Sequence, residues 1–326
     1  MRLKTFAVAL VAGALTLSLT ACGGRRDDSG SEDGSRRLTI ATGNTTGVYY
    51  ALGGGLARLI DRHVEGVTAT ATETGASVQN IEGVVNGRYD IGFSLMDSAS
   101  DAVRGGGAFD EPQDVEALLR LYPNYTQVLA RADSGITSVA DMKGKRVSTG
   151  SPNSGTEVIA LRLLEAAGLD PDKDVHAQRL GLPETVDGMK DGKIDAMFWS
   201  GGLPTGGVTD LTTVMGEDVR FLDLSELLPP LREEYGPIYS VGTIPAKTYA
   251  QPEDVPTIVV PNVLVVRKGF DRDLAGRLVE LIFDRKNDLV SVNPAAEGIL
   301  LETALQTDPI PVNPGAEQAL RRLGVD

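Results

Sequence analysis

Cysteine and histidine are nearly absent from this sequence of 326 residues, which contains one cysteine and two histidines. Without a second cysteine no intramolecular disulfide can form, and a cysteine-ligated metal site is not expected. Neither His63 nor His176 lies near a serine or cysteine nucleophile motif, and no Gly-x-Ser-x-Gly is present. We therefore predict that the chain is not an enzyme and needs no metal or cofactor.

Basic residues are also scarce relative to acidic ones. The chain has 31 Lys and Arg against 45 Asp and Glu, a formal net charge of −14. Nucleic-acid binding depends on clustered Lys and Arg that replace counterions, and binding to anionic lipid through protein charge needs a basic patch. The composition argues against both kinds of partner.

The first 22 residues have the pattern of an export signal. Arg2 and Lys4 precede an apolar run over residues 6–19, which is too short to span a bilayer comfortably. The run ends in Leu-Thr-Ala-Cys, which resembles the lipobox of bacterial lipoproteins. That resemblance implies removal of residues 1–21 and lipidation of Cys22, which would anchor the protein on the extracytoplasmic face of the cell membrane. The alternative is an incidental cysteine in an ordinary signal peptide.

Residues 22–36 are predicted to be a flexible tether, because residues 23–36 carry no large apolar side chain that could be buried. No other segment approaches eighteen consecutive apolar residues, so no further membrane span is expected.

The remaining chain contains two similar α/β units. Each starts with a short strand (38–42 and 145–149), continues into a glycine-rich loop (43–47 and 150–155) and then shows apolar residues at helical spacing. Leu52, Leu56, Leu59 and Ile60 mark the first helix. Each unit closes about 45 residues after its loop with a turn, an aspartate and a buried strand, at 86–93 and 191–198. This order predicts parallel strand pairing.

Two such units predict two lobes, each presenting a glycine-rich loop at the carboxyl ends of its strands, where open α/β sheets bind ligands. A further strand over 263–266, a helix over 272–287 and a last segment at 310–315 are expected to follow. The last segment is predicted to pack back onto the first lobe. We expect lobe I to comprise 37–122 plus 246–326, and lobe II to comprise 123–245.

The loops before the two helices are the main chemical signal. A helix N-terminus offers unpaired N–H groups and partial positive charge, which suit a carboxylate. The alternative for the second loop is a capping box formed by Ser154 and Glu157. Its glycines have the spacing of a phosphate loop, but Thr156 stands where that motif needs lysine, which argues against a nucleotide triphosphate.

Two further features lie beside these loops. Tyr49, Tyr50 and Trp199 could offer apolar contact and a polar tip to a ligand, with core packing as the alternative for Tyr50 and Trp199. The glycine run 53–55 falls inside a helical pattern, where glycine is unfavourable. Either the helix begins later, or another backbone approaches it closely.

Taken together, these segments resemble the TAXI solute receptors of tripartite ATP-independent periplasmic (TRAP) transporters. The similarity covers almost the whole chain after the tether. It is carried by residues 42–50, 73–80, 131–136, 141–147, 150–156, 191–202 and 311–315. The resemblance implies a type II periplasmic-binding-protein fold, in which two α/β lobes joined by a hinge close on a ligand.

The resemblance also implies the ligand and its contacts. Such receptors deliver small organic anions, including glutamate and dicarboxylates, to a polytopic membrane subunit. By position, the resemblance assigns ligand contacts to Thr46, Tyr49, Ser77, Ser154, Gly155, Thr156 and Trp199. With the loop residues, the predicted ligand-binding set is Gly43, Thr46, Tyr49, Tyr50, Gly75, Ser77, Ser151, Ser154, Gly155, Thr156, Trp199 and Gly201. Where family members often have Gln-Ser-Asp, this chain has Leu95, Met96 and Asp97, so two polar contacts are missing.

The sequence therefore predicts a lipid-anchored receptor that captures a small carboxylate for a TRAP transporter. Two alternatives stay open: a co-receptor that reports its ligand to a membrane histidine kinase, and a hydrolase or lyase on the same fold.

Overall fold

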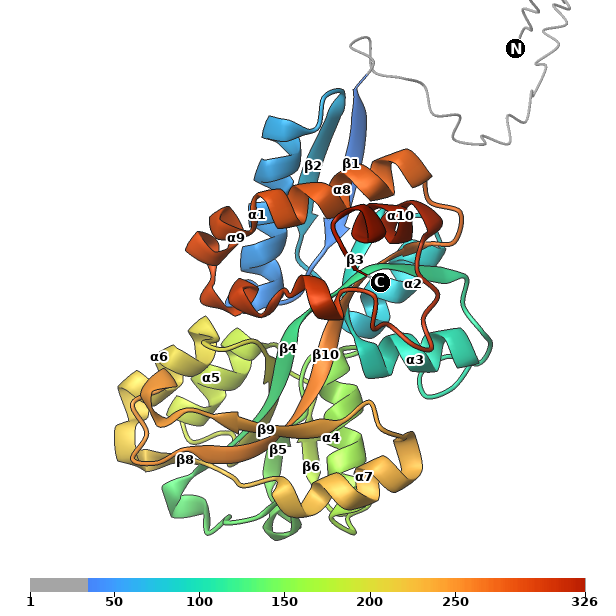
Figure 1. Cartoon of the computed structure of the whole chain (residues 1–326). Helices are drawn as coiled ribbons and strands as arrows, with labels where there is room; N and C mark the ends of the chain where they lie inside the picture. Colours follow the sequence, from blue (N-terminus) through green and yellow to red (C-terminus); the bar gives the residue numbers. More distant parts are fainter. Residues whose placement is uncertain (1–34, 326) are drawn as a thin grey trace, which may run out of the picture. The chain divides into compact units, whose positions relative to one another are not determined.

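The computed structural model describes residues 35–325, which form one ten-stranded sheet with helices packed around it (Figure 1). The strand order is β2-β1-β3-β10-β4-β7-β5-β6, with β8 paired to β4 and β9 paired to β10. Cys22, the predicted signal segment and most of the predicted tether lie outside the described residues. The tether prediction is wrong at its end, because β1 (Arg36–Ala41) already includes Arg36, which pairs with Val67.

The two predicted α/β units are present and share one topology. The first consists of β1, α1 (Val48–His63), β2 (Val67–Thr72), α2 (Ser77–Val85) and β3 (Ile91–Leu95). The second consists of β5 (Arg146–Ser148), α4 (Gly155–Ala166), β6 (His176–Gln178), α5 (Leu182–Lys190) and β7 (Ala196–Gly201). In each unit the first strand lies between the other two and pairs with both in parallel. The parallel pairing confirms the prediction, whereas the strands β2 and β6 were not predicted.

Each unit forms the centre of one lobe (Figure 1). The upper lobe, lobe I, adds α3 (Met96–Arg104), α8 (Arg272–Asp284), α9 (Lys286–Val292) and α10 (Pro314–Arg322). The lower lobe, lobe II, adds α6 (Gly206–Met215), β8 (Val219–Phe221), α7 (Leu228–Tyr235) and β9 (Ser240–Ile244). Short 3₁₀ turns complete the chain at Ala132–Ser134, Val139–Met142, Gly216–Asp218, Ser225–Leu227, Ala246–Thr248, Pro294–Gly298 and Leu301–Thr303.

Two long antiparallel strands, β4 (Val115–Arg131) and β10 (Val255–Arg267), run through both lobes (Figure 1). Pro123 and Pro261 face each other in this pair. Next to them the register shifts, so that Leu121 and Tyr122 of β4 stand opposite Asn262 of β10. Proline cannot donate to the ladder and a bulge bends a strand, so the ladder is interrupted where the chain passes between the lobes.

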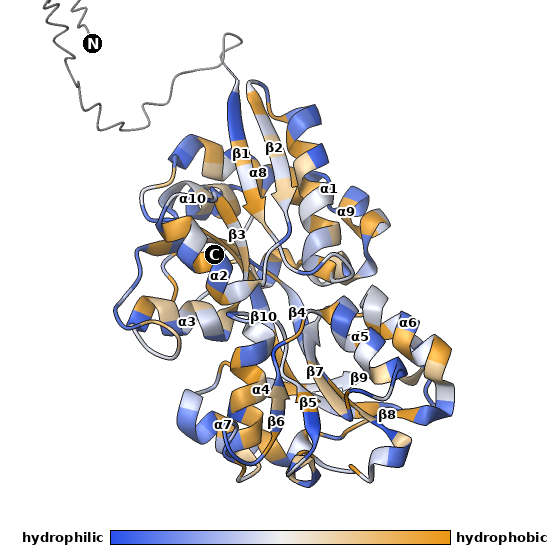
Figure 2. Ribbon diagram, turned by 180° about the vertical axis from the view of Figure 1, so that it is seen from behind, coloured by the Kyte–Doolittle hydropathy of each residue, from blue (hydrophilic) through white to orange (hydrophobic). Residues whose placement is uncertain are grey.

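The core lies on both sides of the sheet. All five residues of β3 are buried, as expected for a strand covered on both faces. Figure 2 shows hydrophobic and hydrophilic residues alternating along α4, α6 and α7, the pattern of helices that cover a sheet. In α1, Leu52, Leu56, Leu59 and Ile60 are all buried, which confirms the predicted face.

The glycine run in α1 is explained by close approach. The helix begins at Val48, so the hypothesis of a later start is wrong. A Cβ atom on Gly53 would overlap Cγ2 of Thr42, and one on Gly55 would lie 3.3 Å from the side chains of Leu289 and Val292 in α9. The sequence predicted that another backbone approaches these glycines, but the groups that approach Gly53 and Gly55 are side chains.

The end of the chain returns to lobe I, as predicted. Val312 bridges to Ala117 in β4, and α10 packs against α8. The helix expected over 272–287 is two helices, because the backbone of Arg285 leaves the helical region between α8 and α9.

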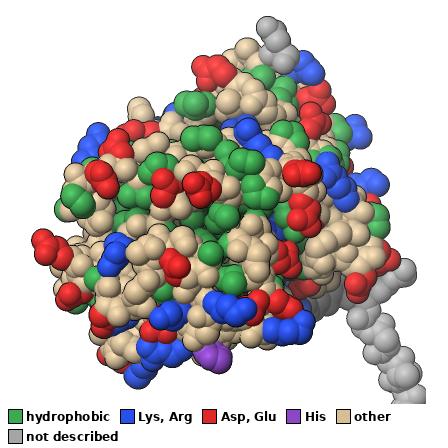
Figure 3. All heavy atoms as spheres, turned by 90° about the horizontal axis from the view of Figure 1, so that it is seen from below, with side chains coloured by type: hydrophobic (Ala, Val, Ile, Leu, Met, Phe, Trp, Pro, Cys, Tyr) green, Lys and Arg blue, Asp and Glu red, His purple; other side chains and the backbone are tan. Residues whose placement is uncertain are grey.

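No helix among residues 35–325 combines the length and the apolar character that crossing a membrane requires. Acidic and basic side chains share the face seen from below lobe II, with Lys and Arg gathered toward one edge (Figure 3).

Candidate ligand-binding site

A small cavity lies between the lobes where the loops after β1 and β5 meet. Its volume is about 30 Å3, similar to the space of one water molecule in the liquid. The lining comes from both lobes and comprises Gly43, Asn44, Gly47, Val48, Tyr49, Gly75, Ala76, Ser151, Ser154, Thr156 and Trp199. The structure thus brings both predicted loops to one place.

Three helices begin at this cavity. Val48 starts α1, Ala76 directly precedes α2, and Ser154 directly precedes α4. The first N–H groups of a helix have no partner within it and carry partial positive charge. No side chain caps α1 or α2. None of the lining side chains carries a formal charge at neutral pH, so the backbone alone makes this cavity favourable for an anion.

The start of α4 is also capped, which was the alternative to ligand binding that the sequence left open for this loop. Ser154 Oγ accepts a hydrogen bond from the N–H of Glu157 at 3.0 Å. The Glu157 carboxylate accepts from the N–H of Asn153 at 2.9 Å and pairs with Arg179, so the box is displaced by one residue. Capping and lining therefore coexist, because the Ser154 hydroxyl still has a proton to donate into the cavity.

Direct hydrogen bonds join the lobes beside the cavity. The N–H of Gln79 in α2 donates to the carbonyl of Asn153 at 3.0 Å. Asn44 Oδ1 accepts from the N–H of Leu182 at 2.8 Å, and Asn44 Nδ2 lies 3.2 Å from Ser151 Oγ. These contacts hold the lobes together around the cavity and account for its small size.

A buried chain of hydrogen bonds connects the cavity wall to the two long strands. The Tyr49 hydroxyl donates to Asn262 Oδ1 at 2.5 Å, and Asn124 Nδ2 donates to the same oxygen at 3.0 Å. Ser200 Oγ then donates to Asn124 Oδ1 at 2.6 Å, and the Ser200 N–H donates to Thr156 Oγ1 at 3.2 Å. Burial raises the pKa of Tyr49 well above its usual value, so the hydroxyl stays a neutral donor.

Of the twelve predicted residues, seven line the cavity, namely Gly43, Tyr49, Gly75, Ser151, Ser154, Thr156 and Trp199. Ser77 and Gly155 lie just behind the lining and face each other across the lobes, since a Cβ on Gly155 would be 2.5 Å from Ser77 Oγ. The carbonyl of Thr46 accepts from the N–H of Gly207 at 3.4 Å, and its side chain is exposed.

The remaining aromatic predictions divide. Tyr50 is 37% exposed and does not line the cavity, so core packing does not describe it, and its contact with a ligand stays a prediction. Trp199 is half-buried, lies against Gly47, and donates from Nε1 to Thr205 Oγ1 at 3.1 Å. A Cβ on Gly201 would overlap Trp199 Nε1, so Gly201 makes room for the indole instead of lining the cavity.

Asn44, Gly47, Val48 and Ala76 also line the cavity and were not predicted. The first three belong to or adjoin the predicted loop 43–47, so their place in that loop was a usable signal. Ala76 has φ 95°, a conformation that residues other than glycine rarely adopt. Such strain costs about 1–3 kcal/mol and is typical of ligand sites, but no sequence pattern announces it.

Leu95 and Met96, which depart from the family pattern, and Asp97, which matches it, do not line the small cavity. Leu95 packs toward Gly155. Met96 lines a different, larger cavity. Asp97 accepts a hydrogen bond from the Tyr239 hydroxyl at 2.8 Å and lies 3.9 Å from Arg162 of α4.

A two-lobed α/β body crossed by two long strands, with a cavity between the lobes, is the fold of the periplasmic-binding proteins. The chain belongs to the NMT1-like family, whose model matches residues 40–324.

Solved structures support the same fold. A binding protein of an ABC phosphonate transporter from Pseudomonas aeruginosa matches with a TM-score of 0.53 at 13% identity, over 81% of this chain and 80% of that one. A protein from Bordetella bronchiseptica matches with a TM-score of 0.51 at 17% identity, over 90% and 93%. A putative L-cystine ABC transporter from Listeria monocytogenes matches with a TM-score of 0.50 at 16% identity, over 81% and 96%. At these identities the likeness concerns the fold alone.

Proposed function

We propose that this protein is an extracytoplasmic solute-binding receptor that captures a small organic anion between its lobes. The observation that carries this proposal is the convergence of the starts of α1, α2 and α4 on one interlobe cavity that has no charged side chain in its wall. A carboxylate there would accept hydrogen bonds from backbone N–H groups of both lobes. A glutamate-like molecule or a dicarboxylate is the class we favour.

Binding requires the lobes to separate. Small-molecule sites generally occupy about 300 Å3 or more, and the cavity of about 30 Å3 is much smaller. The ligand enters when the lobes part and then stabilises the closed form, to the extent that it binds that form more tightly. The interrupted ladder at Pro123 and Pro261 and the bulge beside it are suited to this motion.

We also propose that the chain crosses between the lobes at these two prolines. The first crossing matches the boundary expected from the sequence at residue 123. The second replaces the expected boundary at residue 246, because Tyr249 packs with Leu182 and Met197 of lobe II and residues 255–259 pair with β9. Lobe II would then extend from about residue 123 to about residue 260.

The transporter partner and the anchor are proposals from the sequence. The resemblance to TAXI receptors favours a polytopic TRAP membrane subunit, although two of the solved relatives are named as parts of ABC transporters. A gene for such a subunit beside the gene for this chain would support the proposal, and a gene for an ABC ATPase there would contradict it. If Cys22 is lipidated, Cys22→Ser should release the protein from membranes and leave ligand affinity unchanged.

The ligand can be found by a thermal-shift screen of amino acids, dicarboxylates and 2-oxo acids. A true ligand should raise the midpoint of unfolding and change the emission of Trp199, the only tryptophan, which lies in the cavity wall. Thr156→Val, which removes one lining hydroxyl, should weaken binding about tenfold. Binding by cations and neutral solutes but by no anion would refute the assignment.

A further inference from the structure

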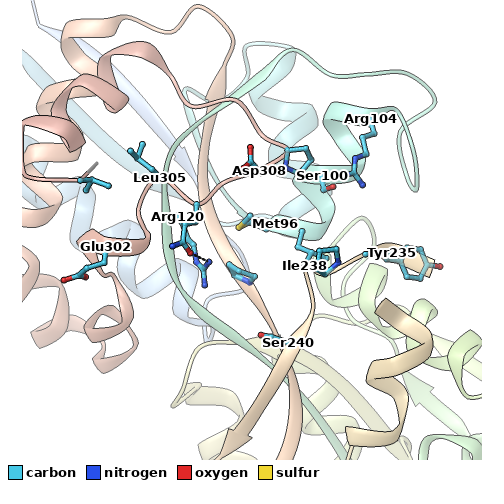
Figure 4. Close-up of a pocket in the computed structure, with 16 residues that line it drawn as sticks. Met96, Ser100, Arg104, Arg120, Tyr235, Ile238, Ser240, Glu302, Leu305 and Asp308 are labelled. Atoms are coloured by element: carbon cyan, nitrogen blue, oxygen red, sulfur yellow. Dashed lines mark hydrogen bonds between the residues drawn. The ribbon is translucent and has the colours of Figure 1, made fainter. Parts of the chain in front are cut away.

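A second, larger cavity lies beside the place where β4 and β10 pass between the lobes (Figure 4). Its volume is about 710 Å3. Lobe I supplies Met96, Ser100 and Arg104 from α3 together with residues 302–309, and the segment 235–240 of lobe II supplies the facing wall. It shares no lining residue with the small cavity.

Arg120 of β4 is the central polar group of this cavity (Figure 4). Its guanidinium is half-buried, and Nη1 donates to Oε1 of Gln306 at 3.1 Å. Within residues 35–325 no carboxylate forms an ion pair with Arg120, and burial lowers its pKa. Withdrawing a guanidinium from water is unfavourable unless an anion accompanies it, so this cavity favours an anionic group next to Arg120.

The other lining residues limit what that anion can be. Buried Met96 and Pro261, with half-buried Ile238 and Leu305, offer an apolar surface for a hydrocarbon part. The lining also contains the exposed carboxylates of Glu302 and Asp308 and the exposed guanidinium of Arg104. The two carboxylates offset the two guanidinium groups, so the lining repels a polyanion more than a single negative charge.

We propose that this cavity is a second binding site, for a small monocarboxylate whose charged group pairs with Arg120 and whose hydrocarbon part rests on Met96 and Pro261. Because both lobes contribute walls, a ligand here contacts lobe I and lobe II at once. These are the same two lobes that must separate to admit the ligand of the interlobe cavity. This site does not depend on the function proposed for the interlobe cavity.

The methyl group of Met96 provides a direct probe. The full chain is labelled with [13C-methyl]methionine, the Met96 signal is identified by its loss in Met96→Leu, and butyrate is added as the probe. We expect the Met96 signal to shift and saturate with butyrate, and not to respond to butylamine or to the neutral methyl butyrate. Arg120→Gln should weaken butyrate binding at least tenfold. Arg88→Gln, which removes an exposed arginine of lobe I that does not line the cavity, is the control and should change nothing.

The proposal is overturned if Met96 does not respond to butyrate, if methyl butyrate and butyrate act alike, or if Arg120→Gln binds butyrate as the wild type does. The comparison with methyl butyrate uses the wild-type protein, so it decides the matter even if Arg120→Gln does not fold. Thr156→Val distinguishes the two sites, because it should weaken binding in the interlobe cavity and leave the Met96 response to butyrate intact.

Discussion

The side-chain oxygen of Asn44 accepts a hydrogen bond from the backbone N–H of Leu182 at 2.8 Å, across the boundary between the lobes. Leu182 is the first residue of α5, and the residue before it, Gly181, has no side chain that could cap the helix. Asn44 therefore supplies to a helix of lobe II the acceptor that this helix lacks. A single loop residue couples the completion of that helix to lobe closure.

Replacing Asn44 should loosen the closed arrangement. In Asn44→Ala the N–H of Leu182 loses its acceptor, and one such bond contributes about 0.5–1.5 kcal/mol. We expect hydrogen exchange at the Leu182 amide to become several-fold faster and the radius of gyration in X-ray scattering to rise. The control is Asn287→Ala, which changes an exposed asparagine in α9. Equal exchange at Leu182 in both variants would show that the contact does not hold the lobes.

Gly155 is a position where one methyl group should keep the lobes apart. Its Cβ would lie 2.5 Å from Ser77 Oγ and 2.6 Å from Leu95 Cδ1, both in lobe I. We expect Gly155→Ala to shift the protein toward an open form with a larger radius of gyration, and to weaken the interlobe ligand about tenfold. Alanine is the better helix former, by about 0.5–1 kcal/mol, so lobe II itself should not unfold more easily.

Leu95→Ala in the Gly155→Ala background provides the matching control, because it removes one of the two side chains that the new methyl group would meet and leaves Ser77 in place. Closure should then return in part. If Gly155→Ala closes as fully as the wild type, the start of α4 does not pack against Ser77 and Leu95 as tightly as these distances indicate.

Neighbouring glycines in α1 should respond in opposite directions. A Cβ on Gly54 would meet only Arg58 Nη1 at 3.6 Å, so Gly54→Ala should stabilise the protein by about 1 kcal/mol. In contrast, Gly53→Ala would overlap the buried Thr42 and should cost about 1–3 kcal/mol. Urea denaturation measures both changes.

The cost at Gly53 should be recovered by a second change. Thr42→Ser removes the methyl group in the way and keeps the hydroxyl, which donates to the carbonyl of Thr72 at 2.6 Å. If Gly53→Ala is as stable as Gly54→Ala, close approach is not the reason for this glycine.

Arg162 should be the most costly single arginine to remove. It pairs from α4 with Asp101 of α3 at 2.5 Å, and its side chain is 8% exposed. In Arg162→Met, Asp97 and Asp101 lose their nearest cation, which in buried pairs costs about 3–5 kcal/mol. Arg321→Met, which breaks the exposed pair with Glu317, should cost at most about 0.5 kcal/mol.

The decrease in the free energy of unfolding caused by Arg162→Met should depend on pH. Burial already raises the pKa of Asp101 above its usual value, although Arg162 opposes the rise. A carboxyl whose pKa is higher in the folded state binds protons more tightly when folded, so stability increases as the pH falls toward that pKa. Denaturation at pH 7 and pH 5 should therefore show a smaller deficit at pH 5. A deficit independent of pH would assign the loss to packing alone.

Much of the fold followed from local patterns. The strands before the loops 43–47 and 150–155, the apolar face of α1 and the two returning strands are each defined by residues close together in sequence. The path of β4 and β10 through both lobes depends on pairings such as Pro123 with Pro261, more than a hundred residues apart. Turn and periodicity signals do not contain such pairings, and for this reason the lobe boundary that we propose near residue 260 differs from the one expected at residue 246.

In the site, the sequence located the loops better than the individual contacts. Tyr49 and Tyr50 looked alike as aromatics after a loop, yet only Tyr49 stands three residues before Leu52, on the buried face of α1. Helical spacing could have separated them. The part played by Asn44 could not be predicted, because its acceptor groups become useful only when Leu182, 138 residues away, is placed beside it.

The wall of the interlobe cavity has one more consequence. Its positive potential comes from peptide groups, which neither gain nor lose protons, and Tyr49 is its only ionisable side chain. The pKa of Tyr49 lies above its usual value, far from physiological pH. The side chains that line the site therefore give it no titration in the acidic or neutral range. Any change of affinity with acidity should follow the ionisation of the solute, and a binding profile against pH would report the solute's own pKa.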